Sequence, residues 1–239
     1  MQLQKRVLVC GDKTVTLYGE NHSPQRRCSR KSVVDYILGC VNTQVYLEMP
    51  MNFTVDAATR PNLLCDSCNG DVLNALRTCV VMKGMKNVVY SDPRELLGTL
   101  PFTKEERDFV ERQQTNWNAD AVVDRFLLPL ITAGQLRNDF PALLHAEQQL
   151  IDKRQVFGIF NAQSRVIWEQ QTFTERMIAA ISSQNIHPCV QLYRDATDLM
   201  FELVVFSMIM ESHQQRHLFY GGRAHSHTLT LLLQMCGFE

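Results

Sequence analysis

Two short segments, one near each end of the chain, share a pattern that constrains how the chain can fold. An apolar, β-branched run at 15–18 leads into Gly-Glu-Asn-His at 19–22, and a similar run at 218–220 leads into Gly-Arg-Ala-His at 222–225. Each segment is typical of a strand that ends in a glycine, followed by two residues and a histidine. Glycine permits backbone conformations closed to other residues, so we expect the chain to leave each strand there.

Polar side chains follow these strands and two others, which indicates a shared site. His22 and His225 come from the two similar segments, Glu20 lies inside the first, and Glu48 follows the strand-like run 45–47. Arg94 comes just after a strand-like run at 87–90. Sites in open α/β sheets form beyond the carboxyl ends of the strands, so we expect these side chains to converge.

Composition limits the classes of partner. The 239 residues are 45% hydrophobic and 21% charged, with a net charge of −1, as in ordinary globular proteins. A nucleic-acid-binding protein would show a larger basic excess, so no nucleic-acid partner is expected. The apolar run 203–210 is far shorter than the ~20 residues of a membrane span.

Cysteine usage and the N-terminus predict a cytoplasmic location. The chain has eight cysteines but is too long for a small disulfide scaffold, so reduced thiols are expected. The N-terminus lacks an apolar stretch long enough for a signal peptide.

The order of the expected elements predicts an α/β fold. Strands are expected at 7–10, 14–18, 45–47 and 87–90, with helices at 33–41 and 71–84 and a hairpin turn at Gly11-Asp12. Helical periodicity then dominates, with apolar faces at 122–130, 166–181 and 199–210, before a last strand at 218–220 and a helix at 226–235. We therefore expect a mixed central sheet flanked by helices. Its core comprises residues 1–100 and 214–239, and a helical subdomain, 101–213, is inserted before the last strand.

Other groups of potential ligands have simpler interpretations. Cys65 and Cys68 form a lone C-x-x-C, which favours a loop with two free thiols over half a zinc site or a labile disulfide. His213 and His217 have the i, i+4 spacing of a metal-binding helix face, but their polar surroundings favour a solvated helix end. His227, two residues after His225, is expected to point elsewhere, either packing behind the site residues or facing solvent.

The motif residues together resemble those of a superfamily that includes the TraB, Tiki, ChaN and erythromycin-esterase proteins. The resemblance rests on Gly19-Glu20-Asn21-His22, Leu47-Glu48, Asp92-Pro93-Arg94 and Gly222-Arg223-Ala224-His225. The Gly-Glu-x-His order of the first segment is similar to that of the esterase branch. The resemblance covers roughly residues 5–98 and 215–239, and it does not extend to the helical middle.

This resemblance implies a metal-dependent hydrolase that acts on a peptide or an ester. In that scheme His22, Glu48 and His225 hold a divalent metal such as Zn²⁺ or Mn²⁺, or one histidine acts as a general base. Glu20 transfers protons or completes the coordination, and Arg94 stabilises the developing negative charge.

Two alternatives stay open, because members of this superfamily differ in activity. The chain could be a non-catalytic structural or assembly protein, forming a homo-oligomer or a larger particle, or a haem- or metal-binding protein. Small stand-alone members occur in large DNA viruses, so the resemblance also implies a viral origin and a place in the virion as an alternative to the cytoplasm.

Overall fold

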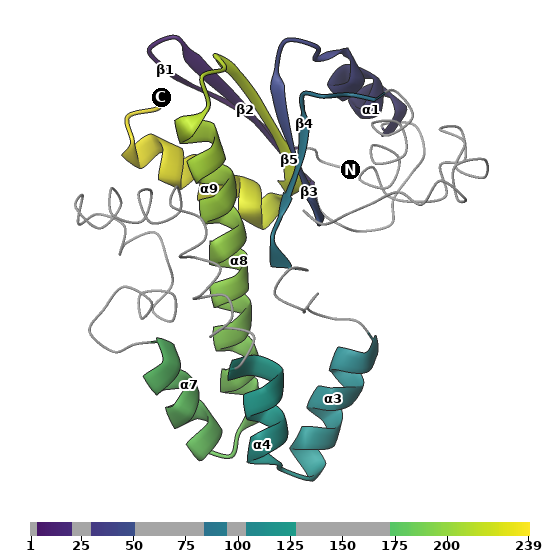
Figure 1. Ribbon diagram of the computed structural model, residues 1–239, viewed down its shortest axis with the longest axis vertical. Coiled ribbons are helices and arrows are strands. Elements are labelled where there is room, and N and C mark those ends of the chain that lie inside the picture. Colours follow the sequence, from purple (N-terminus) through teal and green to yellow (C-terminus); the bar gives the residue numbers. More distant parts are fainter. Residues whose placement is uncertain (1–3, 21–29, 51–83, 95–103, 128–172) are drawn as a thin grey trace. The chain divides into compact units, whose positions relative to one another are not determined.

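The computed structural model describes residues 4–20, 30–50, 84–94, 104–127 and 173–239 (Figure 1). The chain divides into two compact units. The first comprises Met1–Asp92 and Ile209–Glu239, and the second comprises Pro93–Met208.

The first unit is built on a mixed five-stranded sheet in the order β1-β2-β5-β3-β4. Its strands are β1 (Gln4–Cys10), β2 (Lys13–Glu20), β3 (Gln44–Pro50), β4 (Val88–Asp92) and β5 (Arg216–Gly222). β1 and β2 form an antiparallel hairpin, whereas β2, β5, β3 and β4 run parallel. Gly11 has a φ of 59° at the hairpin turn, a left-handed conformation that glycine adopts without strain. The last strand along the chain therefore lies at the centre of the sheet.

Helices α1 (Arg30–Gly39) and α9 (Arg223–Met235) cover opposite faces of this sheet (Figure 1). On the α1 face, Ile37 packs with strand residues that include Val45, Leu218 and Tyr220. α9 contacts β1, β2 and β5 on the other face, and Leu229, Leu232 and Leu233 are buried. The fold is thus α/β, with a mixed sheet flanked by helices and a helical segment before the last strand, as the order of the elements predicts.

The end of α9 is closed by a left-handed glycine. Gly237 has a φ of 88°, its N–H donates to Gln234 O at 3.0 Å, and Phe238 N–H donates to Leu233 O at 3.2 Å. These two bonds form a Schellman motif, which satisfies carbonyls that the helix leaves open. Glu239 then exchanges backbone hydrogen bonds with Val9, so the segment after α9 is fixed to the outer edge of β1.

Lys13 closes the C-terminal end of α8 (Ile186–Glu211). Its Nζ donates to the backbone carbonyls of Ile209, Met210 and Ser212 at 2.9, 3.2 and 3.0 Å. A cation near the C-terminal end of a helix is favourable because that end carries a partial negative charge. Because Lys13 is the first residue of β2, these bonds join the end of α8 to the start of that strand.

The second unit is helical. It contains α3 (Lys104–Thr115), α4 (Ala119–Val122), a π-helix η3 (Val123–Leu127), α7 (Phe173–Ser182) and most of α8. Val122, Phe126, Met177 and Ile181 share a buried core with the first turns of α8. No helix in the described ranges is both long enough and apolar enough to cross a membrane.

Candidate functional site

The carboxyl ends of the parallel strands meet at one edge of the sheet, and three of these strands carry a carboxylate at or near that end. Glu20 is the last residue of β2, Glu48 lies near the end of β3, and Asp92 ends β4. Glu20 and Asp92 are each 3% exposed. Buried carboxylates require polar partners, so this edge is a polar region inside an otherwise apolar core.

Glu48 and His225, two of the five residues expected to converge, are in contact. Glu48 Oε1 lies 3.4 Å from His225 Nε2, and the two side chains are 9% and 10% exposed. Glu48 Oε2 accepts a hydrogen bond of 2.5 Å from the backbone N–H of Gly222. A register shift between Leu47 and Pro50 interrupts the ladder between β3 and β4, and such bulges redirect side chains.

Helix α9 begins at Arg223, three residues earlier than the Ser226 start that the sequence predicted. His225 therefore lies in the first turn of the helix rather than in a loop before it. The N-terminal end of a helix carries a partial positive charge and favours a nearby carboxylate. The carboxylate of Glu48 is at that position, bonded to the residue that precedes the helix.

Glu20 has a different partner. Tyr220 Oη donates to Glu20 Oε2 at 2.5 Å, the short distance expected when a hydroxyl donates to a carboxylate. Because strand side chains alternate, Glu20 shares the α1 face with Tyr18 and Tyr220. Glu48 reaches the first turn of α9, on the opposite face. The two carboxylates thus lie at the same edge of the sheet, on strands separated by β5, but face opposite sides of the sheet.

The sequence predicted that glycine ends each strand because it permits backbone conformations closed to other residues, and this prediction is wrong. The glycines at these strand ends are instead required by close packing. Gly222 has a φ of −62°, which any residue adopts, and Gly19 does not have a positive φ. Gly19 pairs instead with Gly221 across β2 and β5. A Cβ at Gly19 would lie 2.9 Å from Arg223 Cα, and one at Gly221 would lie 2.8 Å from Glu48 Oε2. These positions lack a side chain because α9 and Glu48 occupy the space.

The remaining predicted residues are not part of this contact as the structure describes it. His22 lies outside the described residues, and so do Cys65 and Cys68. Arg94 belongs to the helical unit, where its Nη1 lies 2.9 Å from Asp198 Oδ1 and its guanidinium lies over the ring of Phe201. Its role at the strand ends stays a prediction.

The donor set suits a divalent metal only in part. An imidazole nitrogen and a carboxylate oxygen are ligands that Zn²⁺ and Mn²⁺ accept. Two tetrahedral ligands with bonds of about 2.1 Å lie about 3.4 Å apart, which matches the separation of His225 Nε2 and Glu48 Oε1. No group of three or more His, Cys, Asp or Glu residues suited to a metal occurs within the described ranges. A third ligand would have to come from residues outside these ranges, and His22 is the residue that the sequence predicts for this role.

His217 corrects the interpretation of the histidine pair. α8 ends at Glu211, and His217 is the second residue of β5, 1% exposed. Its Nε2 donates to Gln214 O at 2.8 Å, so its Nδ1, 3.2 Å from Tyr46 Oη, is the acceptor. Burial lowers the pKa of His217 and favours this neutral form. The solvated helix end expected here is correct for His213, which is exposed just after α8, and wrong for His217. His227 is exposed.

Sequence reasoning missed Tyr220 and the backbone N–H of Gly222, which hold the two carboxylates in place. Both belong to the strand that precedes His225, and their spacing to Glu20 and Glu48 depends on the register of β5. A signal was present for Asp92, because it follows an apolar strand just as Glu48 does.

No family model matches this chain, and no curated protein and no solved structure matches it.

Proposed function

We propose that the protein is a hydrolase that activates water at the Glu48–His225 pair, with a peptide or an ester as substrate. The observation that carries this proposal is the approach of Glu48 Oε1 to His225 Nε2 at 3.4 Å, with both side chains about nine-tenths buried. A buried imidazole next to a carboxylate is the usual arrangement of a general base, because the carboxylate orients the ring and stabilises its charged form.

The residues of the pair have separate roles in this proposal. Glu48 is held by the N–H of Gly222 through Oε2, which leaves Oε1 to face His225. An N–H at Nε2 of His225 then points to Glu48, and Nδ1 is left to accept a proton from water. Glu20, held by Tyr220, supplies a second carboxylate at the same edge of the sheet.

A divalent metal is an alternative way to activate the same water. Zn²⁺ or Mn²⁺ held by Glu48, His225 and His22 would act as a Lewis acid and lower the pKa of a bound water. Glu48 and His225 are in contact, and His22 lies outside the described residues.

Matched histidine variants test the proposal. His225→Gln and Glu48→Gln keep the size of each side chain, and His227→Gln changes an exposed histidine of the same helix as a control. With 4-nitrophenyl acetate and a casein digest as probes, we expect the first two variants to lose about 10²-fold or more of the rate and the control to keep it. Zinc and manganese binding, measured by calorimetry, should weaken in the same two variants if the metal route operates.

Equal rates for His225→Gln, Glu48→Gln and His227→Gln would refute the proposal. A folded protein without hydrolysis that forms a large assembly, unchanged by these variants, would favour a structural role. A visible absorption band on addition of haem would favour the haem-binding alternative.

A further inference from the structure

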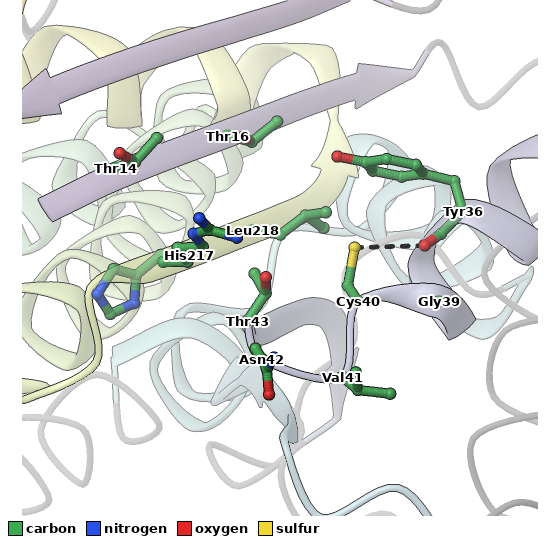
Figure 2. A pocket seen from close by; sticks show the side chains of 11 residues that line it. Thr14, Thr16, Tyr36, Gly39, Cys40, Val41, Asn42, Thr43, His217 and Leu218 are labelled. Atoms are coloured by element: carbon green, nitrogen blue, oxygen red, sulfur yellow. Dashed lines mark hydrogen bonds between the residues drawn. The ribbon is translucent and has the colours of Figure 1, made fainter.

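A cavity opens at the other end of the parallel strands, where β2 and β5 begin (Figure 2). Its volume is about 310 Å³, at the lower end of the range of about 300–1,000 Å³ found for small-molecule sites. One wall is the start of β2 and β5, and the other is the end of α1 with the loop that follows it. The Glu48–His225 pair lies at the opposite, carboxyl end of the same strands.

The charge of this cavity is positive. Arg216 is one of its lining residues, and no Asp or Glu is among those that line it in the described ranges. No carboxylate of the described residues forms an ion pair with Arg216. His217 also borders the cavity, but its imidazole is bonded to Tyr46 and Gln214 and is held neutral by burial.

Hydrogen-bond donors line the strand wall. Thr14 and Thr16 lie along β2 beside the cavity, and Tyr36 faces them from α1 (Figure 2). The hydroxyls of both threonines are without a protein partner in the described part of the chain. A bound anion could therefore accept hydrogen bonds from them in addition to the guanidinium of Arg216.

Backbone carbonyls on the helix wall already accept hydrogen bonds from within the protein. Asn87 Nδ2 donates to Cys40 O and to Thr43 O, each at 2.7 Å. Cys40 Sγ donates to Tyr36 O at 3.3 Å, and Val41 N–H donates to Gly39 O at 2.9 Å. These bonds also fix the shape of the loop, so this wall is formed before any ligand arrives.

Apolar groups complete the cavity. Leu218 and the ring of Tyr36 border it, and Val7 and Val9 lie beside Thr16 and Thr14 on the neighbouring strand. The two valines are 49% and 45% exposed, which leaves apolar surface next to the threonine hydroxyls.

We propose that this cavity binds a small organic anion with one carboxylate or phosphate group and a compact apolar body. Arg216 and the hydroxyls of Thr14 and Thr16 hold the charged group, and Tyr36 and Leu218 contact the body. The inference is independent of the hydrolase proposal, because it uses different residues at the other end of the sheet.

Ring compounds that differ only in the polar group provide the test. Benzoate, phenyl phosphate and benzyl alcohol are titrated into the full chain, and backbone amide shifts are followed by NMR. We expect the anions to shift the amides of Thr14, Thr16 and Arg216 at millimolar concentration, with benzyl alcohol at least ten-fold weaker. The tighter of the two anions identifies the charged group.

Three variants assign the contacts. Arg216→Gln should weaken anion binding about ten-fold and Thr16→Val several-fold, while Arg107→Gln, the same charge change at an exposed position of the helical unit, should leave it unchanged. The melting temperature of Arg216→Gln should equal that of the wild type because Arg216 is exposed. Failure of both anions to bind, equal binding of benzyl alcohol, or wild-type affinity in Arg216→Gln would each overturn the proposal.

Discussion

Replacing Gly221 with alanine should destabilise the sheet and displace the carboxylate of Glu48. A Cβ at this position would lie 2.5 Å from Phe219 Cζ and 2.8 Å from Glu48 Oε2. Nonbonded carbon atoms approach to about 3.5–4.0 Å, so the contact with Phe219 is too short by about 1 Å. Phe219 is fully buried, which limits how far its ring can move.

The expected cost has two parts. Overpacking of a buried site costs about 1–3 kcal/mol, and weakening the hydrogen bond between Glu48 and Gly222 adds part of the about 1.5–3 kcal/mol typical of a bond to a charged group. A total of about 2–5 kcal/mol corresponds to a fall in melting temperature of roughly 5–20 °C for a chain of this size.

Gly39→Ala is the matched control. Gly39 ends α1, its φ is not positive, and a Cβ there meets no atom within 4 Å. Alanine at such a position should be neutral or stabilise by up to about 1 kcal/mol. Both melting temperatures are measured by circular dichroism. If Gly221→Ala melts within about 2 °C of Gly39→Ala, the inference that Phe219 and Glu48 leave no room for a side chain at position 221 is wrong.

Three further predictions concern single residues. Lys13→Met removes the donor of three hydrogen bonds at the end of α8 and should lower the free energy of unfolding, measured with urea, by about 1–3 kcal/mol. Lys86→Met, the same change at an exposed position, should have little effect. The folded-state pKa of His217 lies below the unfolded value of 6.5, so its contribution to stability is fully present above pH 6.5 and is lost as the pH falls through 6.5 towards the folded pKa. His217→Gln should therefore remove part of the loss of stability between about pH 8 and about pH 5, and an unchanged pH profile would contradict this assignment. Gly237→Ala forces alanine into a left-handed conformation and should cost about 1–2 kcal/mol, which the same urea titration would detect as a lower midpoint.

Local patterns in the sequence predicted all five strands. The β-branched and apolar runs identified them, with β1 expected three residues later than it begins, and Gly11-Asp12 identified the hairpin, because these signals depend on neighbouring residues alone. Helix starts were less accurate. α8 begins at Ile186 rather than at Leu199, since Pro188 lies in the first turn, where a helix tolerates proline. α9 begins after Gly222, which has no side chain and so provides no capping signal.

The site was predicted as far as the order of the strands allows. Parallel strands place Glu48 and His225 at one edge, and the structure brings these two together at 3.4 Å. The pairing of Glu20 with Tyr220 and the burial of His217 against Tyr46 depend on which strands are neighbours and in what register. A single sequence contains no local signal for such contacts, because each joins segments far apart along the chain.

The central position of β5 has a consequence for synthesis of the protein on the ribosome. β2 and β3 do not pair with each other; each pairs with β5, whose start at 216 lies 196 residues after the end of β2 at 20 and 166 residues after the end of β3 at 50. At about 5–20 residues per second, the edges of β2 and β3 that face β5 would wait roughly 10–40 s for their partner. During that interval the nascent chain carries two open strand edges, so holdase chaperones that shield such edges should raise the yield of folded protein.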